Sequence, residues 1–130
     1  MRVTISGLAV VVLATSGCLL AAAGAGAGGA IYYTDRGVQS VVAAPVERTF
    51  EVTRQAFQDL GITESKAVTR QEDGSETRSL EGKTSDRDIS IDLKPEGSGT
   101  KVDVVVRKSA VTWDKDFARE ILNRIVEKAK

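Results

Sequence analysis

The sequence contains no histidine and one cysteine, Cys18. Without histidine, the chain lacks the commonest proton-transfer group near neutral pH and the commonest transition-metal ligand. A lone cysteine excludes an internal disulfide. The usual nucleophile–base pairs of hydrolases are therefore missing. We expect a protein that is not an enzyme and that uses neither a metal nor a cofactor.

The sequence also has no excess of positive or negative charge, and it has few aromatic side chains. The 18 lysines and arginines balance the 18 aspartates and glutamates, and aromatic residues make up 5% of the chain. Because no basic field is present, we expect no nucleic-acid partner. The core must be built from aliphatic side chains, and a length of 130 residues fits one domain plus a short leader.

The N-terminal part differs from the rest, since Arg2 is the only charged residue before Asp35. A basic start is followed by the apolar run LAVVVLA and then by Gly17, directly before Cys18. This order is typical of a secretory signal with a small-residue cleavage site. It predicts a signal peptide over residues 1–17.

The stretch ATSGC, which ends at Cys18, resembles the lipobox of bacterial lipoproteins. The resemblance implies that Cys18 receives a diacylglycerol group and becomes the acylated first residue, so that membrane lipid is a partner. Thr15 departs from the pattern, which usually has leucine at this position. Leu19 follows the cysteine where aspartate would favour retention, which implies the outer membrane, facing the periplasm, rather than the inner membrane.

Other interpretations of the apolar start remain open. The uncharged run from Val3 to Thr34 exceeds the roughly 20 residues of a transmembrane helix. Cleavage within residues 21–27 would give a soluble exported protein, and the run could also belong to the core. All but the last of these place the domain after Asp35 outside the cytoplasm.

Residues 18–34 form the predicted Gly/Ala-rich tether that follows the lipidated cysteine. Gly24 and Gly28 make a GxxxG pattern, which can pack membrane helices, but so simple a composition produces it by accident. Tyr32 and Tyr33 fit either a membrane interface or the start of a first strand.

Residues 35–130 predict one small domain. A β-rich run over 37–43 precedes Pro45, which suits the first turn of a helix, and Gly61 suits its end. The spacing predicts a helix over 45–60 with the apolar face Val46, Phe50, Thr53, Phe57 and Leu60. A second helix is predicted over 114–129, with Asp114 or Thr112 as its cap. Its apolar face consists of Phe117, Ile121, Leu122, Ile125 and Val126.

Four strands are expected between the helices, over 62–71, 75–84, 88–93 and 100–107. The turns at 72–74 and 95–99 are too short for parallel crossovers. We therefore predict an α+β fold with two layers, element order β-α-β-β-β-β-α and an antiparallel sheet of order 1-5-4-3-2. Because the last two strands alternate apolar and polar residues, both helices should cover one face and leave the other in water.

Two features of the sequence could indicate a ligand site, but each also has a structural explanation. The run DRDISID over residues 86–92, which begins at Asp86 and includes Asp88, Ser90 and Asp92, resembles the start of a calcium loop. Ile91, however, stands where that loop needs glycine and Gly97 where it needs glutamate. A strand explains the same residues better. Trp113 is interpreted as a cap on the core at the last helix rather than a ligand platform.

The run VVAAPVERTF over 41–50, the segment DLGI over 59–62 and the closing ILNRI over 121–125 follow the lipobox. This arrangement resembles a family of small bacterial lipoproteins, domain-of-unknown-function family 3568, which implies no activity. APVERTF is also similar to the opening of helix-grip lipid carriers. We expect a membrane-anchored cell-envelope lipoprotein, a non-catalytic structural or interaction module with a possible envelope protein partner. The alternative is a small-ligand or lipid-binding periplasmic domain.

Overall fold

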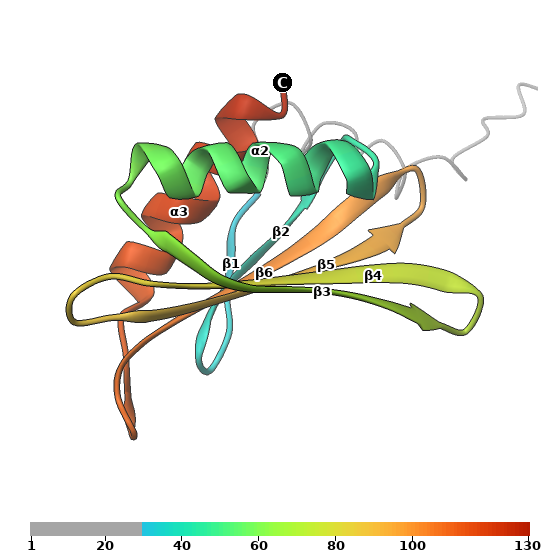
Figure 1. Ribbon diagram of the computed structural model, residues 1–130. Helices are drawn as coiled ribbons and strands as arrows, with labels where there is room; N and C mark the ends of the chain where they lie inside the picture. Colours follow the sequence, from blue (N-terminus) through green and yellow to red (C-terminus); the bar gives the residue numbers. More distant parts are fainter. Residues whose placement is uncertain (1–29) are drawn as a thin grey trace, which may run out of the picture.

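The computed structural model describes residues 30–130, which form one antiparallel sheet and two helices (Figure 1). The elements are β1 (Tyr32–Tyr33), β2 (Gly37–Val42), α2 (Val46–Asp59), β3 (Thr63–Glu72), β4 (Ser75–Lys83), β5 (Asp88–Glu96), β6 (Gly99–Ser109), β7 (Thr112–Trp113) and α3 (Lys115–Lys128). The fold is α+β, as predicted.

The order of the long strands is confirmed. Strands run in the order β1-β2-β6-β5-β4-β3, and β7 pairs with β6. The five predicted strands correspond to β2 and β3–β6, so the expected order 1-5-4-3-2 is the observed one. The central β5 is aligned with both neighbours through Ile91, which lies opposite Leu80 on one side and Val104 on the other.

Two short strands were not predicted as separate elements. Strand β1 pairs with β2 through Tyr32 and Tyr33, within the segment assigned to the tether, and both side chains remain exposed. Strand β7 pairs with the end of β6. Each contains only two residues, so neither can show the alternation by which a strand is recognised in sequence.

The helices begin and end close to the predicted positions. Pro45 is the N-cap of α2, and Gly61 has a φ of +69° just after the helix. The side chain of Asp114 caps α3 by accepting a hydrogen bond from the Phe117 amide at 3.0 Å. At the other ends of the helices, the Lys128 ammonium lies 2.8 Å from Asp59 Oδ2 and so joins α3 to α2.

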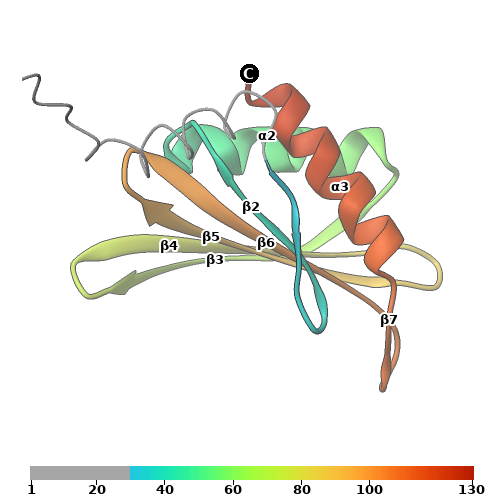
Figure 2. The same ribbon diagram turned by 180° about the vertical axis from the view of Figure 1, so that it is seen from behind.

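Both helices cover the same face of the sheet, as Figures 1 and 2 show from opposite sides. Helix α2 contacts β3–β6, whereas α3 contacts β2, β6 and α2. The sheet side of this core consists of Val38, Val42, Leu80, Ile89, Ile91, Leu93, Val102, Val104 and Val106. The predicted alternation in the last two long strands is thereby confirmed.

The buried stripe of α2 is wider than its predicted apolar face. Thr49, Val52 and Ala56 are buried besides the expected Phe50, Thr53 and Phe57. The reason is that α2 packs against both the sheet and α3. The buried threonine hydroxyls bond to carbonyl oxygens of the preceding turn, so these polar groups are satisfied inside the core.

Candidate functional site

The face of the sheet opposite the helices carries rows of polar side chains that face each other across strands. One row contains Ser79, Asp92 and Asp103, and the next contains Lys94 and Lys101. Polar residues occur here because alternate positions of each strand point away from the core. We call this surface the open face. Its polar side chains take no part in the packing of the core and are therefore candidates for a function.

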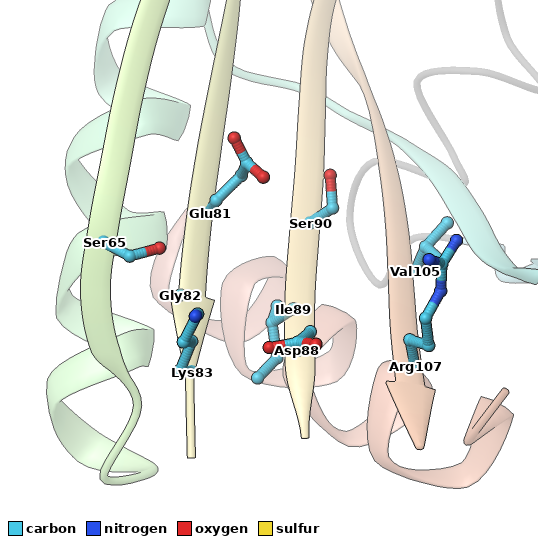
Figure 3. A pocket seen from close by; sticks show the side chains of 9 residues that line it. All are labelled: Ser65, Glu81, Gly82, Lys83, Asp88, Ile89, Ser90, Val105 and Arg107. Atoms are coloured by element: carbon cyan, nitrogen blue, oxygen red, sulfur yellow. The ribbon is translucent and has the colours of Figure 1, made fainter. Parts of the chain in front are cut away.

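The open face contains a cavity of about 420 Å³ over β3–β6 (Figure 3). It is lined by Ser65, Glu81, Gly82, Lys83, Asp88, Ile89, Ser90, Val105 and Arg107. Lys83, Asp88 and Arg107 lie opposite one another on three adjacent strands. Within residues 30–130, neither these three nor Glu81 takes part in an ion pair.

These charges are free to bind charged groups of another molecule. Each could pair with a charged group of a partner without first breaking a bond within the domain. Both signs are present side by side, so a polar partner that carries both signs would be complementary. The alternation in the sequence predicts that Asp88 faces water. It does not predict that Lys83 and Arg107 lie beside Asp88, because that depends on how the strands are aligned.

A second feature of the open face is a pair of like charges, since Asp92 and Asp103 lie directly opposite. Ser79 Oγ donates a 2.6 Å hydrogen bond to Asp92, whereas the Oδ1 atom of Asp103 is buried and has no partner among the described residues. Burial and then the negative charge of Asp92 raise the pKa of Asp103 above its ordinary value of 3.8. Directly opposed like charges destabilise a sheet.

Replacing Asp103 by asparagine is therefore expected to stabilise the domain by about 0.5 kcal/mol near pH 7, because the like-charge pair is lost but remains partly screened by solvent. A carboxyl whose pKa is raised by folding costs stability when ionised, and that cost disappears as the pH falls toward 3.8. The gain should therefore shrink on acidification. Urea unfolding of the wild type and of Asp103→Asn, at about pH 7 and at about pH 4, measures this gain in stability.

Asp88→Asn is the control for this substitution. It removes one negative charge from the same face, but Asp88 lies between Lys83 and Arg107 and opposes no acid. No stabilisation is expected from it. Equal gains from both variants, or a gain from Asp103→Asn that does not depend on pH, would contradict the like-charge explanation.

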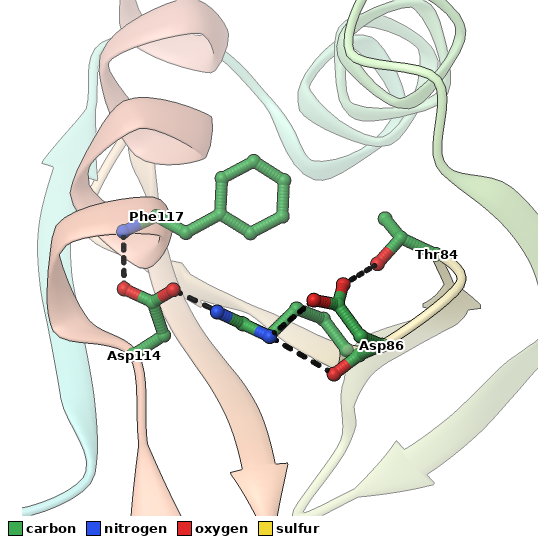
Figure 4. Close-up of polar contacts among 5 residues, drawn as sticks. Thr84, Asp86, Asp114 and Phe117 are labelled. Carbon is green, nitrogen blue, oxygen red and sulfur yellow. Dashed lines mark hydrogen bonds and ion pairs between the residues drawn. The ribbon is translucent and has the colours of Figure 1, made fainter.

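A separate polar network joins the β4–β5 connection to the start of α3 (Figure 4). Arg87 Nε donates a 3.1 Å bond to Asp114 Oδ2, and its Nη1 lies 2.8 Å from Asp86 Oδ2. Burial alone would raise the pKa of Asp114, but the Phe117 amide and Arg87 outweigh it, and the pKa is lowered. Because Asp114 also caps the helix, the network serves structure.

Trp113, interpreted from the sequence as a cap on the core, lies in the short strand β7 just before α3 and is not among the residues that pack against the core. Its side chain is half-buried in β7, and the Arg36 guanidinium lies 5.8 Å from the ring centroid. Its Nε1 atom is buried without a hydrogen-bond partner among the described residues. The contact fastens the β1–β2 turn to the β6–β7 hairpin.

The remaining candidate residues fall in two classes. Cys18, Thr15 and the predicted signal peptide lie outside the described residues. Asp88, Ser90 and Asp92 lie in β5, which confirms the strand interpretation, and residues 30–130 contain no group of three or more acidic or cysteine side chains placed to hold a metal ion. Neither α2 nor α3 is long and apolar enough to cross a bilayer.

Comparison with known proteins identifies a family. No curated protein and no solved structure matches the chain significantly. The model of a family described as "Protein of unknown function (DUF3568)" matches residues 2–128, in agreement with the resemblance found in the sequence. Because this match covers nearly the whole sequence, the chain belongs to the DUF3568 family.

Proposed function

We propose that this protein is a membrane-anchored lipoprotein of the bacterial cell envelope, held through acylated Cys18 in the outer membrane and facing the periplasm. The observation that carries the proposal is the position of Cys18, which follows a basic start, an apolar run and a small residue. Acylation would give the only cysteine a role that needs no disulfide partner.

The domain acts as a non-catalytic interaction module, and its open face is the contact surface. The uncommitted charges of Lys83, Asp88 and Arg107 around the 420 Å³ cavity support this part of the proposal. They favour a polar envelope component, such as a protein, over an acyl chain. A ligand held between sheet and helices has less support, because side chains such as Ile91 and Leu122 are completely buried there.

Replacing Cys18 by alanine is expected to abolish acylation, because alanine has no sulfur to form the thioether. The test is to grow cells with a labelled fatty acid, fractionate the envelope and determine the mass of the mature N-terminus. The unaltered chain should carry the label on Cys18 and sediment with outer membranes, whereas Cys18→Ala should carry none.

Thr15→Leu is the matched variant, since it restores the residue usual in the lipobox and should leave labelling equal or increased. Label on Cys18→Ala, or an unlabelled mature chain in the wild type, would overturn the anchor. The interaction part is tested separately by chemical cross-linking in the same membranes with Arg107→Glu. A cross-linked product unchanged by this reversal would show that the open face is not the contact surface.

A further inference from the structure

Strand β3 forms one edge of the sheet and is the longest edge segment of the described fold. It pairs with β4 alone, and nine of its ten residues are exposed. Figure 1 shows β3 along the near edge of the sheet, below α2. An edge of this kind presents a row of unpaired backbone groups to any chain that can align with it.

The turn to β4 determines which backbone groups point outward. Asp73 and Gly74 both have positive φ, 49° and 77°, as in a two-residue type I′ turn. Glu72 and Ser75, which close this turn, then form a hydrogen-bonded pair, and pairs alternate from there. The N–H and C=O groups of Ala67, Thr69 and Gln71 therefore point away from β4.

A bulge limits the regular part of this edge. The register with β4 shifts between Glu64 and Lys66, so the uninterrupted segment begins at Lys66 and ends at Glu72. Glu64 is moreover engaged by Arg54, with Nε 3.0 Å from Oε1. An incoming strand can thus form a regular ladder with residues 66–72 and not beyond the bulge.

The charges of this segment are complementary to themselves in one antiparallel alignment. When Thr69 meets Thr69 of a second copy, Lys66 lies opposite Glu72 at both ends and Val68 lies opposite Arg70. Shifting the alignment so that Val68 meets Val68 would instead place Lys66 opposite Arg70. Opposite charges across strands stabilise pairing, and like charges oppose it.

We propose that two copies of this protein associate edge to edge through residues 66–72 of β3, antiparallel and with Thr69 facing Thr69. The two sheets then continue into one, with the open faces on the same side. Charged side chains on an edge strand discourage unselective pairing. Here they also favour the alignment with Thr69 facing Thr69 over alignments shifted along the strand. The association does not depend on the lipid anchor.

Charge reversal tests the association in the purified full chain by sedimentation at several concentrations. Lys66→Glu places glutamate opposite Glu72 twice, and Glu72→Lys places lysine opposite Lys66 twice. Each variant should weaken dimerisation about tenfold. The double variant restores opposite charges and should dimerise like the wild type. Glu120→Lys, the same charge change at an exposed position on α3, should have no effect.

Cysteine pairs test the alignment. Differently tagged Val68→Cys and Arg70→Cys chains, mixed and oxidised, should form a mixed disulfide, because residues directly opposite on adjacent strands are close enough for one. Val68→Cys alone should cross-link little, and mixing it with the wild type reports any bridge through Cys18. A wild type that stays monomeric, single reversals without effect, or a preferred Val68→Cys self-link would overturn the proposal.

Discussion

Replacing Gly37 by alanine is expected to destabilise the domain by about 3 kcal/mol, a large part of the roughly 5–15 kcal/mol that stabilises a small domain. Gly37 begins β2 opposite Val105, and a Cβ atom added to it would lie 2.0 Å from the carbonyl oxygen of Val104. The obstacle is backbone of the neighbouring strand and not a side chain that could rotate. Relieving the clash requires β2 to move away from β6.

The control for this substitution is Gly97→Ala in the β5–β6 turn. Gly97 has a φ of +60°, but no atom lies within 4 Å of the added Cβ. It should therefore cost only the conformational strain, about 1 kcal/mol. Urea unfolding followed by circular dichroism compares both variants with the wild type. If Gly37→Ala were no less stable than Gly97→Ala, the close approach of β2 to Val104 would be wrong.

Replacing Ile91 by alanine is the second substitution with a large expected effect, about 2–5 kcal/mol. Ile91 is completely buried in β5, between Leu80 on β4 and Val104 on β6. The helices cover this part of the sheet, so the surroundings cannot readily collapse into the space that three lost carbon atoms would leave. The cost therefore includes a cavity as well as the lost burial.

Ser90→Ala, one residue earlier, tests the two-sided character of the same strand. Ser90 points to the open face, and its loss should change the free energy of unfolding by no more than about 0.5 kcal/mol. Urea unfolding compares the two variants: a lower midpoint at an unchanged slope reports a loss of stability. We expect that loss for Ile91→Ala and not for Ser90→Ala. A similar loss of stability in both variants would mean that β5 is not buried on one side and wet on the other.

The layers of the fold could be predicted because the signal was repeated along the chain. Ile89, Ile91 and Leu93 alternate with polar residues, and the capped helix from Asp114 has an apolar stripe. Strand β3 lacks such alternation because it lies at an edge, where little of it is buried. Its main signal in the sequence is the Asp73-Gly74 turn that follows it.

The candidate site could be predicted only in part, because it depends on register. Alternation places Asp88 on the wet face, but only the alignment of β4 and β6 brings Lys83 and Arg107 beside it. The Arg87–Asp114 pair likewise joins segments that are distant in the sequence. No local pattern reports such contacts, since the residues around each partner are those of ordinary solvent-exposed turns.

Because β1 is only two residues long, it can detach easily, and the distance between the domain and a fixed N-terminus can then increase. Strand β1 carries only Tyr32 and Tyr33, both exposed, whereas β2 is paired with β6 along its whole length. Detaching β1 would remove only the partly buried Ile31 from the edge of the core and would free residues 32–36, each adding about 3.4 Å of reach when extended. A small force on the N-terminus would thus detach β1. Pulling further, from Gly37 onward, would have to separate β2 from β6 and so disrupt the sheet.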